Sequence, residues 1–195
     1  MSRVIGKESG QVLAPLHTAI RRCVKCPLHQ SRKHAVPGEG ARHAAILFVG
    51  EAPGKLEDEH GRPFCGRAGR FLDTLFQRCG LKRNRVFITN SVKCRPRNDR
   101  PPRSHELETC YSYWLRRQIE IIHPKIVVLL GKIPVRQLLH INRSLKRLHG
   151  RFYRKGDRLY QVQYHPAAGM RFPNLGEAMK RDFEKLRRKS RAINP

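Results

Sequence analysis

Four short apolar runs are the clearest pattern along the chain, and each one is ended by a glycine or a polar residue. They cover residues 45–49, 86–90, 125–130 and 159–164. Continuous apolar runs of this length are typical of strands buried on both faces, as in a parallel sheet. The pattern therefore predicts four parallel strands.

Apolar residues at helical spacing lie between and around these runs. The predicted helices cover 13–23, 70–80 and 134–140, and two more begin after Ser104 and at Asn174. In the last helix, Glu177 is expected to complete a cap-like pair with the first residue. Alternating strands and helices predict an α/β fold of three layers, αβα, with a central four-stranded parallel sheet.

The length of the chain suits one folding unit. A chain of 195 residues buries enough surface for a single domain over 1–195. We expect its core at 12–188 and a loose basic tail after Lys189.

Polar and glycine residues stand at the carboxyl ends of all four predicted strands. Gly50 and Glu51 follow the first strand, Asn90 ends the second, Gly131 follows the third and His165 follows the fourth. Ligands of open α/β sheets bind at this edge, so these side chains are expected to share a pocket capable of acid/base chemistry. Taken singly, Asn90 also reads as a turn amide and His165 as a surface imidazole.

The long segment between the first strand and the first predicted helix adds to this pocket. It holds Gly54, the acids Glu57, Asp58 and Glu59, and an aromatic ring, Phe64, which is either a stacking group or loop packing. The chain has no Walker lysine motif, no Gly-x-Gly-x-x-Gly and no serine elbow. A nucleotide-cofactor enzyme is therefore poorly supported.

Charge points to a polyanionic partner. The chain has 41 Lys and Arg against 15 Asp and Glu, a net charge of +26 and a pI near 11.0. Such an excess favours nucleic-acid binding over a merely solvated surface. Residues 132–158 hold nine of these basic residues and one acid, Asp157, interleaved with aromatics. Phe152 and Tyr153 alternate with basic residues as in an exposed hairpin, and the stretch is expected to follow a nucleic-acid backbone or else to be a solvated loop.

Four of the six cysteines have the spacing of a metal site. Cys23 and Cys26 form a Cys-x-x-Cys followed by proline, and Cys94 and Cys110 are a second, distant pair. Four thiolates suit zinc or an iron–sulfur cluster, and softness alone does not choose between them. The alternative is that Cys110 belongs to the core and Cys94 is incidental. Cys79 continues a helical apolar stripe and is expected in the core.

The expected location is inside the cell, in the cytoplasm. No apolar stretch approaches the roughly 20 residues of a membrane span, and residues 1–11 have no signal-peptide core. In that compartment the cysteines are not expected to form structural disulfides.

Four segments together resemble the motifs of the family 4 uracil-DNA glycosylases, which contain an iron–sulfur cluster. They are Gly-Glu-Ala-Pro-Gly at 50–54 with Glu57 and Asp58, Gly-Arg-Pro-Phe-Cys-Gly-Arg-Ala-Gly at 61–69, Ile-Thr-Asn-Ser-Val-Lys-Cys-Arg-Pro at 88–96, and Tyr-His-Pro-Ala-Ala at 164–168. The resemblance runs from Leu16 to Leu186. It implies a monomeric, monofunctional repair enzyme that flips uracil out of single- or double-stranded DNA and leaves an abasic site. It also implies a place beside the nucleoid.

The resemblance also implies roles for single residues. Cys23, Cys26, Cys94 and Cys110 fall on the ligands of a structural [4Fe–4S] cluster. The uracil pocket would comprise Gly50, Ala52, Phe64 as the stacking ring and Asn90 as the reader of the polar edge. Glu51 and Glu57 would lie by the attacking water, and His165 would stabilise the leaving uracil anion. The DNA contacts would come from Arg67, Pro166, Met170 and Arg171.

Two departures from the family pattern and two rival functions stay open. Cys65 replaces a valine, and Gly169-Met170 stands where the family has bulky leucines, in the expected loop that fills the gap left by the flipped base. A covalent uracil-DNA-binding relative would use a histidine near His105. The other rival is a catalytically silent nucleic-acid-binding module with a zinc site. A replication clamp is a further possible partner, which nothing in the sequence supports.

Overall fold

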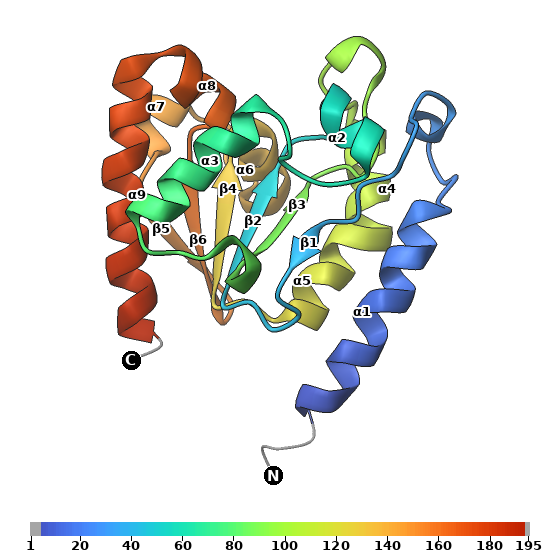
Figure 1. Ribbon diagram of the computed structural model, residues 1–195, viewed down its shortest axis with the longest axis horizontal. Helices are drawn as coiled ribbons and strands as arrows, with labels where there is room; N and C mark the ends of the chain where they lie inside the picture. Colours follow the sequence, from blue (N-terminus) through green and yellow to red (C-terminus); the bar gives the residue numbers. More distant parts are fainter. Residues whose placement is uncertain (1–4, 194–195) are drawn as a thin grey trace.

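The computed structural model describes the backbone of residues 5–193 and the side chains of residues 13–193. One six-stranded sheet lies between two layers of helices (Figure 1). The strands, in chain order, are β1 (Glu39–Gly40), β2 (Ile46–Gly50), β3 (Phe87–Asn90), β4 (Ile126–Leu130), β5 (Phe152–Lys155) and β6 (Arg158–Gln163). Their order across the sheet is β1-β3-β2-β4-β6-β5.

The four predicted strands are the four central ones, and they are parallel to one another as expected. The sheet is larger than predicted because β1 and β5 add an antiparallel strand at each edge. Neither edge strand has a long apolar run: β1 is only Glu39–Gly40, and β5 is the basic and aromatic strand of the predicted hairpin. An edge strand pairs on one side only and needs no continuous apolar sequence.

The helices divide between the two faces of the sheet (Figure 1). The helices α3 (Arg67–Arg78), α8 (Pro166–Arg171) and α9 (Pro173–Ile193) pack on one face. The other face is covered by α1 (Ile5–Arg21), α5 (Arg116–Ile122), α6 (Lys132–Leu139) and α7 (Leu145–Leu148). Between β2 and α3 lies α2 (Lys55–His60), and α4 (Ser104–Cys110) continues into α5 through a π-helical turn, Tyr111–Leu115. Short 3₁₀ turns cover Pro27–Gln30, Arg83–Arg85 and Arg97–Asp99.

Alternation along each strand explains the three layers. In β2, Leu47 and Val49 belong to the core on the α5 face, whereas Ile46 and Phe48 belong to the core on the α9 face. Successive side chains of a strand point to opposite faces, so an all-apolar strand must be covered twice. The three-layer αβα prediction is confirmed.

Several predicted boundaries were wrong. The helix α3 begins at Arg67, three residues before the predicted start. The segment after His165 is the helix α8, not a loop. The tail after Lys189 is not loose, because α9 continues to Ile193, and residues 194–195 lie outside the described part. Glu177, which was expected in a cap-like pair with the first residue of this helix, forms an ion pair with Lys180, whose Nζ lies 2.6 Å from Glu177 Oε1.

Among the helices of residues 5–193, none is both long enough and apolar enough to cross a membrane.

Candidate active site

A cavity of about 160 Å³ opens at the carboxyl ends of the central strands. Its lining is Ala52, Gly54, Glu57, Phe64, Ala68, Asn90 and His165. Strand β3 supplies Asn90, the end of β6 leads into His165, and the segment after β2 supplies the rest. The structure thus brings together in one cavity the aromatic ring, the amide, the imidazole and one of the carboxylates that the sequence placed at this edge.

Gly50 is not part of the lining itself, but it lies directly beside two lining residues, Phe64 and Asn90. It pairs with Asn90 across the parallel ladder of β2 and β3. A Cβ at Gly50 would lie 2.7 Å from Cζ of Phe64 and would strike the Asn90 amide oxygen. Only glycine therefore lets the ring and the amide approach the strand end this closely.

The Phe64 ring is held in the cavity by an unusual backbone. Its φ is 49°, in the left-handed region that a bulky residue seldom adopts. The backbone of Gly69 packs directly against the Phe64 carbonyl, where any side chain would collide. The ring itself is buried, and its centroid lies 5.8 Å from that of the His165 ring, at 32° to it.

Asn90 is a buried amide with an unused acceptor. The residue is 1% exposed, and among the described residues its Oδ1 has no hydrogen-bond partner. Its backbone carbonyl accepts from Nζ of Lys93 at 2.8 Å, which fixes the strand end. A buried acceptor without a partner is costly, so this oxygen is suited to receive an N–H from a ligand in the cavity.

His165 is arranged as a neutral hydrogen-bond donor. As the N-cap of α8, its Nδ1 accepts from the backbone N–H of Ala167 at 3.2 Å, so the ring proton belongs on Nε2. Burial lowers the pKa of His165 to about 4, and the nearby Glu57 only partly opposes this. The imidazole is therefore uncharged at neutral pH and presents an Nε2–H.

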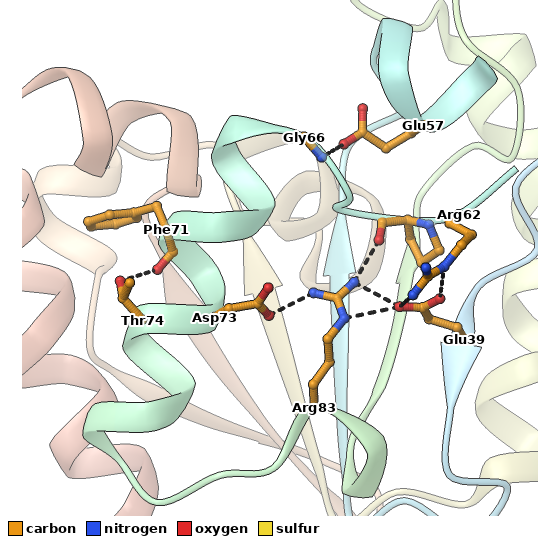
Figure 2. Close-up of polar contacts among 9 residues, drawn as sticks. Glu39, Glu57, Arg62, Gly66, Phe71, Asp73, Thr74 and Arg83 are labelled. Atoms are coloured by element: carbon orange, nitrogen blue, oxygen red, sulfur yellow. Dashed lines mark hydrogen bonds and ion pairs between the residues drawn. The ribbon is translucent and has the colours of Figure 1, made fainter. Parts of the chain in front are cut away.

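The two predicted catalytic acids differ in their positions. Glu57 lines the cavity, and its Oε1 accepts from the backbone N–H of Gly66 at 2.9 Å (Figure 2). Glu51 follows β2 and is half-buried, but its side chain is not part of the lining. Burial raises the pKa of Glu51.

Asp58 serves the scaffold and not the cavity. It is 3% exposed and accepts from the backbone N–H groups of Lys33 and His34. Its motif neighbour Glu57 instead lines the cavity, because adjacent residues of a helix such as α2 are turned by about 100° from each other. Asp58 thereby fastens α2 to the segment after Cys26.

The residues predicted to touch DNA lie outside the cavity. Arg67 begins α3 and is exposed, while Met170 (40% exposed) and the exposed Arg171 lie on α8. Pro166 is buried as the first residue of α8. The sequence analysis missed Phe172, which is 47% exposed next to them and has the Arg171 guanidinium 5.4 Å from its ring centroid.

The four cysteines of the predicted metal site surround a second, enclosed cavity. Cys23, Cys26, Cys94 and Cys110 line it, together with Leu28, Val92, Lys93, Thr109 and Trp114. Cys65 and Cys79 lie elsewhere. Within the described residues, no three or more His, Cys, Asp or Glu side chains are grouped closely enough around one point to hold a single metal ion.

Each sulfur at this cavity faces a hydrogen-bond donor. Trp114 Nε1 donates to Cys23 at 3.2 Å, and an Arg32 guanidinium N–H donates to Cys94 at 2.9 Å. Against the burial that raises both pKa values, the backbone N–H of Leu28 favours the thiolate of Cys26, and that of Lys93 favours the thiolate of Cys110. Donors of this kind stabilise thiolate ligands and tune the clusters that they hold.

Positive charge is built in beside the same sulfurs. Lys93 is only 1% exposed, and its ammonium lies near Cys94 and Cys110. Burial raises the pKa of Cys94 to about 11 and that of Cys110 to about 12, so free thiols would stay protonated there. A bound metal group would reverse this, because metals bind the thiolate form.

His105 does not join the candidate active site. It is exposed as the second residue of α4 and is not part of the cavity lining. A covalent mechanism through this histidine has no support in the geometry.

Comparisons with known proteins agree with these features. The model of the uracil DNA glycosylase superfamily matches residues 37–189. The type-4 uracil-DNA glycosylase of Pyrobaculum aerophilum is 44% identical over 179 residues, 88% of this chain and 91% of that protein. The type-4 enzyme of Sulfurisphaera tokodaii is 44% identical over 174 residues, 85% of this chain and 79% of its own. The type-5 uracil-DNA glycosylase of Pyrobaculum aerophilum is 32% identical over 150 residues, 68% of this chain and 65% of that protein.

Proposed function

The chain belongs to the uracil DNA glycosylase superfamily, and we propose that it is a DNA repair enzyme that flips uracil out of DNA and hydrolyses its N-glycosidic bond. The observation that carries the proposal is the shared cavity of Phe64, Asn90 and His165, with an unpaired amide oxygen buried beside an aromatic ring. An extrahelical pyrimidine needs a stacking surface and partners for its polar edge, and this cavity offers both. The product would be an abasic site and free uracil.

Recognition would depend on Phe64 and Asn90. The ring stacks on the flipped base, while the Asn90 Oδ1 accepts from uracil N3–H and its NH₂ donates to O4. Cytosine presents the opposite groups at both positions, so it would leave buried polar atoms unpaired. Mismatches of this kind discriminate by large factors.

Cleavage of the glycosidic bond would depend on stabilising the charges that develop on the sugar and on the base. As the glycosidic bond breaks, the sugar becomes positive and the base negative. The neutral His165, with its proton on Nε2, can donate a hydrogen bond to uracil O2 as negative charge develops there. A donor aimed at a developing anion contributes to catalysis because it is already oriented. Glu57 and Glu51 would hold the attacking water and stabilise the positive sugar.

DNA would be held outside the cavity. Arg67 and Arg171 are exposed cations next to the cavity elements, and Met170 is the candidate wedge that fills the gap in the base stack. The net charge of +26 supports binding to the phosphate backbone. We propose that the protein acts as a monomer, associated with the DNA inside the cell.

A [4Fe–4S] cluster is proposed at Cys23, Cys26, Cys94 and Cys110. The four thiols around one cavity and the donor on each sulfur fit such a group, and Lys93 and Arg32 offset its negative charge. When bound, the cluster would supply a structural clamp. It would join the segment after α1 to the segment after β3, which carries Asn90, and to α4.

The decisive experiment is a uracil-release assay. Single-stranded, U·G and U·A oligonucleotides would be incubated with the protein, and abasic sites would be cleaved with alkali and counted. We expect release from uracil substrates and none from matched cytosine or thymine controls, with mispaired uracil the least costly to extrude. DNA binding without release would favour the silent binding module, and a denaturant-resistant complex would favour the covalent relative.

A further inference from the structure

Arg83 is not part of the cavity lining, and its guanidinium lies between Asp73 and Glu39 (Figure 2). Its guanidinium joins three segments that are distant in the chain. Nη2 donates to the Pro63 carbonyl at 2.7 Å, Nε and Nη2 donate to Glu39 Oε1 at 3.0 and 2.9 Å, and Nη1 donates to Asp73 Oδ1 at 2.8 Å. The side chain is 25% exposed, so these bonds are partly shielded from water.

The Pro63 carbonyl belongs to the peptide that leads into Phe64. Its orientation is therefore tied directly to the φ of Phe64, which is held at 49°. A phenylalanine in this left-handed region is strained and persists only when surrounding contacts determine it. On one side the contact is Gly69 against the Phe64 carbonyl, and on the other it is Arg83 on the carbonyl of Pro63.

The other end of Arg83 is anchored to the sheet. Glu39 lies in β1, opposite Ile88 of β3, the strand that ends at Asn90. Burial alone would raise the pKa of Glu39, but hydrogen bonds from Arg62 and Arg83 bring it below its ordinary value. Glu39 is therefore a stable carboxylate, and it ties Arg83 to the strand that carries the uracil-reading amide.

We propose that Arg83 is a positioning residue for the base-stacking ring, Phe64. By bridging the Pro63 carbonyl and the Glu39 carboxylate, it keeps Phe64 in its left-handed turn and at a set distance from Asn90. This inference rests on the proposed function, in which Phe64 stacks on uracil. Arg83 itself touches neither substrate nor the reacting atoms. Charge alone is not sufficient, because the bonds to Pro63 and Glu39 need the forked geometry of a guanidinium.

A double-mutant cycle separates this role from general stabilisation. We expect Arg83→Gln to lower kcat/KM on uracil DNA about tenfold in the wild-type background, but less than about twofold when Phe64 is already replaced by Ala, because contacting residues are non-additive. The variant Arg83→Lys, which keeps the charge and loses the fork, should behave like Arg83→Gln. A purely structural role would give the same loss in both backgrounds and would overturn the proposal.

Arg62 offers a matched control. Its Nε donates to Glu39 Oε2 at 3.0 Å, so it shares this carboxylate with Arg83, but its side chain is 65% exposed and, within the described residues, forms no hydrogen bond with Pro63. Arg62→Gln should therefore leave kcat/KM within about twofold, as is usual for an exposed ion pair. A loss equal to that of Arg83→Gln would show that Glu39, and not the Pro63 carbonyl, matters.

Hydrogen exchange tests the same inference without uracil. Amides of segment 61–69 should exchange faster in Arg83→Gln than in Arg62→Gln, while amides of β4 stay protected in both. Unchanged exchange in segment 61–69 would overturn the proposal even if the enzyme were active. If this segment exchanges faster in Arg83→Gln but the wild-type protein itself releases no uracil, the anchoring role of Arg83 stands and the proposed function is rejected.

Discussion

Gly50 and Asn90 end two neighbouring parallel strands as a register pair, and a side chain at Gly50 would strike the Asn90 amide oxygen. The same side chain would reach Phe64. One glycine therefore lets the Phe64 ring and the Asn90 amide both approach the strand end, although it contributes no chemical group of its own.

We expect Gly50→Ala to lower kcat/KM for uracil release about 100-fold, because a displacement of about 1 Å in a positioned site can have an effect of this size. Thermal unfolding would show how far the fold is affected. The control is Gly80→Ala, which strains a left-handed glycine (φ +65°) with nothing within 4 Å of the added atom. Equal losses of activity in both variants would contradict a specific effect on the cavity.

Replacing Asn90 should damage recognition of the base more than binding of DNA. Asn90→Ala removes both groups proposed to read uracil, and we expect kcat/KM to fall by about a factor of 1,000 or more, since sites built to hydrogen-bond a substrate discriminate strongly. The Kd for undamaged duplex should stay within about threefold, because it depends on phosphate contacts. Parallel losses in excision and in binding would rule out the assigned role.

The acid limit of activity should reveal the low pKa of His165. Its pKa is about 4 in the folded protein against 6.5 for an ordinary histidine, so protonation of this ring should reduce kcat/KM only as the pH approaches 4. Between pH 6.5 and 4 the unfolded chain binds a proton that the folded ring does not, so this group also makes stability fall as the pH is lowered. An acid limb near pH 6.5 that disappears in His165→Asn would contradict the neutral imidazole.

Removal of the proposed metal group should change the fluorescence of Trp114, the chain's only tryptophan. Trp114 donates to Cys23, so a bound cluster would quench its emission by contact. We expect chelation, or Cys94→Ser, to raise tryptophan fluorescence, abolish visible absorbance and lower the unfolding temperature, because metal binding contributes directly to folding. Cys65→Ser should retain full iron content, since Cys65 lies outside the site. One zinc per chain and no iron would favour the four-cysteine zinc alternative.

The salt dependence of DNA binding should count the phosphate contacts. Arg67→Gln and Arg171→Gln should each reduce the slope of log K against log salt by about 1 and weaken binding to all sequences alike. Arg116→Gln is the control, because Arg116 lies on α5, beside Glu120 and away from the cavity. An unchanged slope for Arg171→Gln would move the DNA path away from α8.

Much of the architecture could be predicted from the amino-acid sequence. The apolar runs predicted the four central strands, and the residues at their ends predicted which groups would share an edge. Both are properties of neighbouring residues, because period and run length set which faces of an element are buried. The edge strands and the extent of α9 were not predicted, since β1 has no apolar run and the basic end of α9 gives no sign that the helix continues.

What the tertiary structure decided is how those groups are held. The family resemblance named Glu57 and not Asp58 as a catalytic acid, but the residue pattern alone did not show that Asp58 anchors a distant segment or that Glu51 lies outside the lining. It also gave no sign that Arg83 would reach Glu39 across 44 residues, or Trp114 would reach Cys23 across 91. The sequence determines which residue types are available for chemistry. The tautomer of His165, the burial of each side chain and its hydrogen-bond partners depend on contacts between segments far apart in the chain.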